Sequence, residues 1–521
     1  MNPEHKNFVM VSGIKLLTIV SLGMTAYLVF RLTQGAYITT FHDFPSHCRE
    51  ATENIAAIMF RNGKSPYYEN FPHYYTGYGP IYYWITSLLL SSDSLLEAAF
   101  VQRGLNWGFV FSTMFIFVML CRKKIPNCFM ESLTLAVVLG VMLAYFSNEM
   151  GSKPGCLAFF FAFLGSIYPY YCNFSQRSFI IAITCCAVAF SSKQMFVGFA
   201  IAILGYHLLA FGFKRTIFLF MLFIMQSYGF IFLLENIYPN ITATFSPTTV
   251  TLLGMNITIS LARINQIIFL TFSVMLFVII SFLIDINKYF QYNKLRSFHL
   301  FIKKNYLTYV CCFLFLYYVL LSSHGGNNNI YAAHTFISFM FLAFLQYSDT
   351  YKNIIIKYVS IISLIIILIT TISFFEKSFR RMKRDYSDSW HEWSAIILRH
   401  DKIYAHRSFA QILAGHGKHV EVFGQEEFMV PQNFYFYKDE LTLRKFDSII
   451  SVKNTIDSAG YDLLLLEMRE GKGVFWWGEN MSEEDLFAKG YRKIGEGDVN
   501  TAWVGYRIGV FKRAADIHAT P

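Results

Sequence analysis

Residues 216–235, TIFLFMLFIMQSYGFIFLLE, form a continuous apolar run whose one charged residue stands at the last position. A helix rises about 1.5 Å per residue, so this run would be about 30 Å long, which is the thickness of the hydrocarbon core of a bilayer. Inside lipid, the backbone must satisfy its own hydrogen bonds, which favours a helix over open strands. The run therefore predicts a membrane-spanning helix.

Similar apolar blocks recur along the chain. Of its 521 residues, 55% are hydrophobic and 18% aromatic, whereas only 15% are charged. A soluble protein carries about 25% charged residues. We therefore expect a mostly α fold, a polytopic membrane helical bundle of about eleven spans with a C-terminal soluble α/β domain. The predicted spans are 8–30, 103–121, 131–146, 156–172, 178–191, 196–212, 216–235, 264–285, 306–322, 330–347 and 354–374.

The segment 78–92, YGPIYYWITSLLLSS, decides the sidedness of the other segments. It is short for a full crossing and rich in Tyr and Trp, so we interpret it as a helix at the membrane surface. The basic loops then fall on one side, which the positive-inside rule makes cytoplasmic. These basic residues are Arg122, Lys123, Lys124, Arg177, Lys214, Arg215, Lys288, Lys294, Arg296, Lys303 and Lys304. The net charge of +10 is thus a topology signal, and nucleic acid is not an expected partner.

This topology divides the chain into two parts. Residues 1–375 form the membrane domain, which includes an outer loop at 31–77, and residues 376–521 form a soluble domain outside the membrane. In the second part, HVEVF, YDLLLLEM and TAWVGYRIGVF are typical of strands. Helical patterns cover residues 389–413 and the segment after Ser482, which is a candidate N-cap. We expect a structural or acceptor-binding role for this domain.

Several polar groups converge on the predicted outer side at the level of the membrane. Charged groups near hydrocarbon are costly and often mark the path of a substrate. Asp43, in the long aromatic loop 31–77, is a candidate general base, because a partly desolvated carboxylate has a raised proton affinity. Arg103, Lys153 and Lys193 are candidate ligands of a leaving phosphate, although Arg103 could instead neutralise a carboxylate within the bundle.

The motifs of the outer side resemble those of GT-C-type integral membrane glycosyltransferases, especially the bacterial family 39 and aminoarabinose transferase group. The similar segments are HDFP at 42–45, RNGKSPYYE at 61–69, YGPIYYW at 78–84, SSKQMF at 191–196 and HGGNNNIYAAH at 324–334. The likeness covers about residues 10–345. Lys153-Pro154-Gly155 departs from the R-P-D sequence of many relatives, and Glu149 is a candidate replacement for the missing carboxylate.

The resemblance implies a fold, a reaction and a place in the cell. It implies transfer of a monosaccharide from an undecaprenyl-phosphate carrier, with inversion, at the periplasmic side of a bacterial inner membrane. The acceptor would be a hydroxyl of a surface glycan, such as O-antigen or lipopolysaccharide, or of a glycolipid. It implies a catalytic role for Asp43 with His42 beside it. Candidate substrate-binding residues are Arg103, Lys153, Lys193, Glu149, Tyr67, Tyr78, Asn328, Asn329 and His334.

Other interpretations of the same residues stay open. Tyr67 and Tyr78 could stack on a sugar or belong to the aromatic belt of the membrane interface. Glu50, Glu53 and Glu69 are predicted to be solvated loop charges. The cysteines lack metal-type spacing, so no cofactor is expected and the sequence does not indicate a divalent metal. The alternative functions are an O-antigen ligase or polymerase and a transporter or flippase of lipid-linked sugars.

Overall fold

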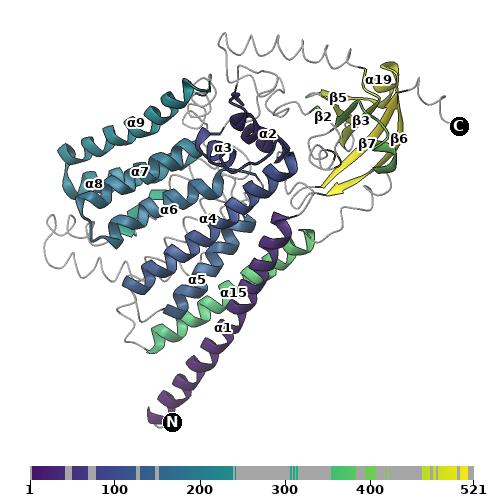
Figure 1. Ribbon diagram of the computed structural model, residues 1–521. Helices are drawn as coiled ribbons and strands as arrows, with labels where there is room; N and C mark the ends of the chain where they lie inside the picture. The colour runs from purple at the N-terminus through teal and green to yellow at the C-terminus, as the bar shows by residue number, and fades with distance from the viewer. Residues whose placement is uncertain are drawn as a thin grey trace.

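The structure is a computed structural model of the chain. It describes residues 3–41, 50–67, 78–124, 129–146, 152–238, 241, 306–307, 309–310, 313–314, 354–382, 394–405, 413, 416, 420–421, 460–469, 473–476, 479–500 and 505–513. Most of these residues are helical, and the remainder include one small sheet (Figure 1). The predicted mostly α fold is therefore confirmed.

Within these described ranges, four helical segments are long and apolar enough to cross a membrane: Ser12–Thr40, Leu95–Lys124, Gln194–Phe211 and Phe213–Glu235. They belong to α1 (Pro3–Thr40), α4 (Leu95–Lys124), α8 (Val197–Phe211) with the turn before it, and α9 (Phe213–Glu235). The shorter helices between them are α5 (Phe129–Val141), which continues in a π-helical turn at Met142–Phe146, α6 (Gly155–Tyr171) and α7 (Gln176–Ser192). Of the predicted spans, 264–285, 306–322 and 330–347 lie wholly or mostly outside the described residues.

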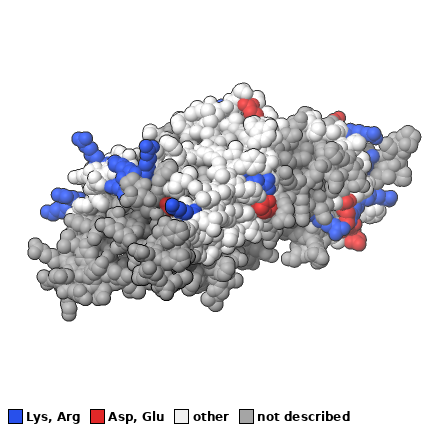
Figure 2. Space-filling view, turned by 90° about the horizontal axis from the view of Figure 1, so that it is seen from below, with Lys and Arg blue, Asp and Glu red and all other residues white. Residues whose placement is uncertain are grey.

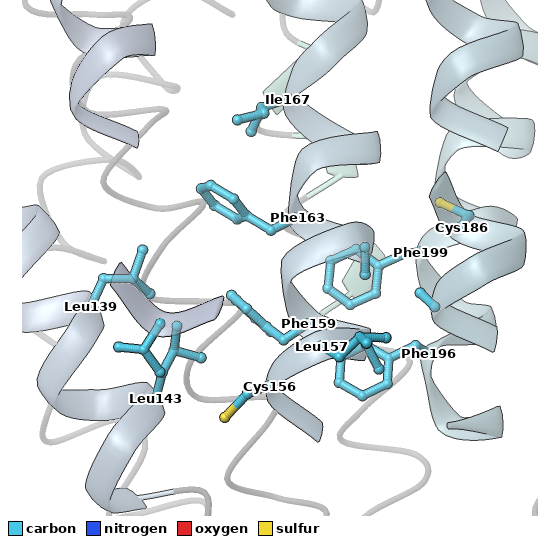
Figure 3. Close-up of a cluster of buried hydrophobic side chains, with 14 of the residues drawn as sticks. Leu139, Leu143, Cys156, Leu157, Phe159, Phe163, Ile167, Cys186, Phe196 and Phe199 are labelled. Carbon is cyan, nitrogen blue, oxygen red and sulfur yellow. The ribbon is translucent and has the colours of Figure 1, made fainter. Parts of the chain in front are cut away.

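The bundle packs around aromatic side chains (Figure 3). On α6, the rings of Phe159 and Phe163 stack with centroids 5.8 Å apart, and Phe159 meets the rings of Phe196 and Phe199 edge-on, each at 6.4 Å. Aromatic pairs of this kind contribute about 0.5–1.5 kcal/mol each beyond the area that they bury. Such close packing holds the helices together.

A small residue sets the distance between α6 and α7. A Cβ atom at Gly165 would lie 2.7 Å from the carbonyl oxygen of Ala182, so the two backbones approach closely there. The helices are joined by a tight turn in which Asn173 and Phe174 both have positive φ, at 52° and 60°. Small residues allow helices in a bilayer to gain contact area in this way.

The first helix and α15 (Ile354–Met382) lie side by side (Figure 1). Arg31 on α1 donates from Nε and Nη2 to the two carboxylate oxygens of Glu376 on α15, at 2.9 and 2.8 Å. Tyr27 donates to the same carboxylate at 2.6 Å, and the Arg31 guanidinium lies 3.8 Å from the ring centroid of Phe379. This pairing joins the two helices.

Two short helices, α2 (Glu50–Arg61) and α3 (Pro80–Ser87), lie at the end of the bundle where α1 ends (Figure 1). The described part of the predicted loop 31–77 is therefore largely helical. Helix α3 begins with Pro80, whose missing N–H is not needed in a first turn. Its 8 residues extend about 12 Å, which is too short for a crossing. The placement of segment 78–92 at a bilayer surface stays a prediction.

In the described residues of the C-terminal part, seven strands form one sheet. Strand β3 (Leu463–Arg469) pairs in parallel with β1 (Ile403–Ala405) and antiparallel with β4 (Gly473–Trp476) and β7 (Gly505–Arg513). Three further strands lie beside these: β2 (Val420–Glu421) pairs with β1, β5 (Glu479–Met481) pairs with β4, and β6 (Tyr491–Asn500) pairs with β7. Residues 463–466 are all buried, as their apolar run predicts.

The local predictions in this part had mixed outcomes. The predicted N-cap is confirmed, because the Ser482 hydroxyl accepts the N–H of Asp485 at the start of α19 (Glu483–Ala488). The helical pattern at 389–413 is wrong in part, since residues 403–405 form β1. Pairing with β3, which lies sixty residues later, overrides the local helical preference. The domain boundary at 375 stays a prediction.

Candidate functional site

A buried ion pair joins α2 to α4 at the end of the bundle that carries the two short helices. Arg103 donates from Nε and Nη2 to the two carboxylate oxygens of Glu50, both at 2.7 Å, and both side chains are fully buried. Parallel double hydrogen bonds of this kind are the strongest arrangement for a guanidinium and a carboxylate. The expectation that Glu50 and Glu53 are solvated loop charges is wrong, because α2 buries both against the bundle.

The same ion pair connects two further segments of the chain. Ser152, which precedes α6, donates to Glu50 Oε1 at 3.2 Å, and Arg103 Nη1 donates to the carbonyl oxygen of Thr39 at 3.2 Å. The indole N–H of Trp107 donates to the hydroxyl of Thr39 at 2.8 Å. The end of α1, the start of α2, the middle of α4 and the approach to α6 are thereby held together. Thr39 stands four residues before Asp43 in the sequence.

A second set of buried polar groups lies one turn further along α2. Tyr83 on α3 donates its hydroxyl hydrogen to Glu53, and Gln102 Nε2 donates to the backbone oxygen of Glu53 at 3.2 Å. Tyr82 in turn donates to the backbone oxygen of Gln102 at 3.2 Å. Within the part of the chain that the structure describes, neither amide atom of the fully buried Asn54 has a hydrogen-bond partner. Buried amides of this kind usually bind water or a ligand.

Two buried lysines belong to the same end of the bundle. Lys153 is 6% exposed, and its backbone oxygen accepts from Asn106 Nδ2 at 3.1 Å, just before α6 begins. Lys193 is 5% exposed and follows the last residue of α7, where its N–H donates to the carbonyl oxygen of Ala189. Its ammonium nitrogen lies 5.0 Å from the ring centroid of Tyr78. A cation over an aromatic face is stabilised by the ring quadrupole.

The chain between α2 and α3 lies directly against the end of α7. Gly79 N–H donates to the Ser192 carbonyl oxygen at 3.1 Å. A Cβ atom at Gly79 would lie 1.8 Å from the carbonyl oxygen of Ser191, so only glycine fits. The fully buried Tyr67 donates its hydroxyl hydrogen to the backbone oxygen of Tyr78 at 3.0 Å. Burial raises the pKa of Tyr67 well above its ordinary value, with nearby carboxylates adding to the effect, so this hydroxyl stays a donor.

The structure brings five of the sequence-predicted site residues to one end of the bundle: Arg103, Lys153, Lys193, Tyr67 and Tyr78. Of the two roles considered for Arg103, its geometry is that of a cation that neutralises a carboxylate. The other predicted residues lie outside the described part of the chain: His42, Asp43, Glu149, Asn328, Asn329 and His334.

Sequence reasoning missed the buried polar face of α2. Glu50, Glu53 and Asn54 have the spacing i, i+3, i+4, which places them on one face of a helix together with the buried Ala57. That spacing was the available signal. It was not decisive because no local pattern reveals that Arg103, 53 residues later, faces Glu50.

The arrangement can bind and neutralise an anion at the end of the bundle. In the described part of the chain, three cationic side chains and two carboxylates are buried there, and the aromatic residues Trp107, Tyr82 and Tyr83 are buried at the same end. Among the described residues, no group of three or more His, Cys, Asp or Glu side chains is arranged to hold a metal ion. No model of a known protein family matches the chain, and no curated protein matches it.

Proposed function

We propose that the protein is a membrane glycosyltransferase of the GT-C type. In this proposal, it moves a monosaccharide from an undecaprenyl-phosphate carrier to a hydroxyl of a surface glycan or glycolipid. The observation that supports it best is the connected set of buried charged groups around the Glu50–Arg103 pair, at the bundle end from which the chain leads to Asp43. A membrane-level site with buried cations suits a substrate that joins a long apolar tail to a phosphate.

The proposed reaction is a single displacement. The acceptor oxygen attacks the anomeric carbon, the bond between that carbon and the phosphate oxygen breaks, and undecaprenyl phosphate leaves with the bonding electrons. The proton of the acceptor hydroxyl passes to the carboxylate of Asp43, with His42 beside it. Lys153 and Lys193 would stabilise the charge on the leaving phosphate. Attack from the side opposite the phosphate inverts the anomeric configuration.

The Glu50–Arg103 pair has a positioning role in this scheme. Arg103 holds the carbonyl of Thr39, and Glu50 accepts from Ser152, which is adjacent to Lys153. The pair thereby holds the segment that leads to Asp43 close to the segment that carries Lys153. Fixing reacting groups relative to each other before the reaction lowers the barrier, because less order must be gained in the transition state.

The full topology belongs to the same proposal. About eleven spans would place the N-terminus in the cytoplasm and the site, together with the sheet of residues 403–513, in the periplasm of a bacterial inner membrane. The four long apolar helices and the basic ends of α4 and α9 support this orientation.

The test is a transfer assay with the purified full chain. Radiolabelled polyprenyl-phosphate sugars are incubated with candidate glycan and glycolipid acceptors, and wild type is compared with Asp43→Asn. Loss of the general base is expected to lower kcat by about 10²–10⁴-fold. Asp93→Asn is the matched control, because Asp93 is 57% exposed and pairs only at the surface with Arg61.

Each outcome separates one part of the proposal from another. If Asp43→Asn transfers sugar as fast as wild type, the general-base assignment is wrong. If wild type binds lipid-linked sugars without transferring them to any acceptor, a transporter or flippase explains the chain better. If it transfers whole lipid-linked glycans instead of monosaccharides, the ligase or polymerase alternative is correct.

A further inference from the structure

The opposite end of the bundle carries a set of basic side chains that the proposed reaction does not use. This basic rim consists of Arg122, Lys123, Lys124, Arg177, Lys214 and Arg215. Figure 2 shows groups of Lys and Arg side chains at both ends of the visible face. Helix α4 runs from Arg103 at the candidate site to Lys124 at the rim, and 21 residues of helix extend about 30 Å. The rim and the candidate site therefore lie at opposite ends of the bundle.

Two lysines of the rim are held in defined positions. The ammonium nitrogen of Lys123 lies 3.7 Å from the ring centroid of Tyr171. Lys124 donates to Asn173 Oδ1 at 2.7 Å, and its nitrogen lies 4.9 Å from the ring centroid of Tyr170. Asn173 stands in the tight turn between α6 and α7, where its positive φ of 52° fixes the position of the acceptor. These lysine side chains are thus already ordered in the folded protein, so less conformational entropy is lost when an anion binds.

In the proposed topology, the rim stands at the level where phospholipid headgroups meet hydrocarbon. Helix α4 ends at Lys124, and α9 begins at Phe213, one residue before Lys214; both helices are long and apolar enough to span the membrane. Phe213 is 68% exposed, which suits a side chain that faces lipid. The three segments of the rim, residues 121–124, 171–178 and 211–216, contain no Asp or Glu. Basic pockets between helices at this depth attract anionic headgroups.

We propose that the basic rim contains a binding site for the phosphodiester headgroup of an anionic phospholipid, with Lys123 and Lys124 as its principal ligands. Each ammonium group has three N–H donors, so a lysine that contacts a ring or an amide still has donors for phosphate oxygens. Arg177, the second residue of α7, follows the same turn and adds a third positive charge close to it in sequence. The apolar surface beside the rim would receive the acyl chains.

Lipid binding by the intact chain tests this proposal. Wild type is incorporated into nanodiscs of phosphatidylcholine, and titration with phosphatidylglycerol is followed by native mass spectrometry at 0.15 M salt. Salt at this concentration screens diffuse attraction beyond about 8 Å but leaves close contacts. We expect phosphatidylglycerol to stay bound to wild type where phosphatidylcholine exchanges, and added inorganic phosphate not to displace it at millimolar concentration.

Two double variants with equal charge loss locate the site. Lys123→Gln/Lys124→Gln is expected to weaken phosphatidylglycerol binding by about 25-fold, since each cation near the headgroups contributes about 5-fold. The matched control, Lys214→Gln/Arg215→Gln, is expected to lose at most a few-fold. Lys123→Arg/Lys124→Arg keeps the charge and should keep most of the binding, which separates loss of charge from loss of folding.

The proposal is overturned by any of three results. Equal binding of phosphatidylcholine and phosphatidylglycerol by wild type would show that no anionic site exists. Equal losses in the two Gln variants would show diffuse attraction to the whole rim instead of a site at Lys123 and Lys124. A loss in the Arg variant as large as that in the Gln variant would show that charge is not the basis of binding. None of these results depends on sugar transfer.

Discussion

Replacing Glu50 by glutamine removes one charge from the ion pair that joins α2 to α4. In the structure, Arg103 makes two hydrogen bonds of 2.7 Å to Glu50, and both side chains are fully buried. The neutral amide of the variant has one oxygen to offer, so the guanidinium loses the counter-charge that Glu50 supplies. Breaking a buried pair in this way typically costs about 3–5 kcal/mol. We expect Glu50→Gln to destabilise the chain by that amount.

Removing both charges should cost less than removing either one. In Glu50→Met/Arg103→Met, neither charge of this pair is left without the other, and replacement of a buried pair by apolar groups is often neutral or stabilising. Among the described contacts of the pair, the Ser152 hydroxyl and the Thr39 carbonyl oxygen each lose a hydrogen-bond partner in this double variant. At about 1 kcal/mol each, these losses add up to about 2 kcal/mol.

Unfolding of the purified chain in mixed micelles, titrated with sodium dodecyl sulfate and followed by tryptophan fluorescence, gives the free energies. The control is Asp93→Asn, which breaks the pair between Arg61 and Asp93 at the other end of α2. Its side chains are 30% and 57% exposed, so water screens the pair, and the expected cost is below about 1 kcal/mol.

Two results would refute this reasoning. If Glu50→Gln unfolds at the same detergent fraction as Asp93→Asn, the pair is not buried in the way that the structure shows. If the double Met variant is destabilised by the full sum of its two single changes, the two side chains do not interact. A double variant that is more stable than Glu50→Gln but less active in transfer would separate the positioning role from stability.

Three further predictions concern other parts of the chain. Gly79→Ala should disrupt the packing of the α2–α3 connection against α7 and lower the yield of folded protein in gel filtration, whereas Gly108→Ala, with no atom within 4 Å of the new Cβ, should not. Bonds from the N–H and the hydroxyl of Ser482 lower the pKa of Asp485. Protection of the α19 amides, measured by hydrogen exchange corrected for intrinsic rate, should therefore be constant above about pH 4 and fall below it. Ser482→Ala keeps the backbone N–H bond and removes the hydroxyl bond, so it should weaken this dependence without abolishing it. Lys193→Gln should lower kcat/KM for a polyprenyl-phosphate sugar by about 10–100-fold, as expected for the loss of one charge-assisted hydrogen bond. Lys193→Arg should recover part of the lost kcat/KM. Unchanged kinetics of the Gln variant would show that Lys193 is not part of the site.

Within the part of the chain that the structure describes, hydropathy predicted the positions of the helices. The apolar run at 216–235 lies within α9, and the run at 103–121 lies within α4. This success has a simple cause, because the thickness of a bilayer sets the length of a span and the backbone must bond to itself within it. The cap at Ser482 was equally readable, since a capping box involves only residues three positions apart.

The candidate site was predicted only in part. Arg103, Lys153 and Lys193 attracted attention because charges near apolar runs are rare, and all three are buried at the same end of the bundle. Glu50 was misassigned because its surroundings in sequence are polar, as those of a solvated loop are. Its burial depends on helix α4 lying across α2, which is a contact between segments that are distant in the chain.

Local composition thus determined which segments of this chain form long apolar helices, since the formation of such a helix depends on the residues of that segment and on the solvent around it. Tertiary structure decided which polar groups face one another: Glu50 with Arg103, Lys193 with Tyr78, and Gly79 with the end of α7. Tertiary structure also decided that residues 403–405 form a strand, because β3, sixty residues later, pairs with them through backbone hydrogen bonds. Pairing energies of this kind exceed local preferences and leave no trace in a short window of sequence.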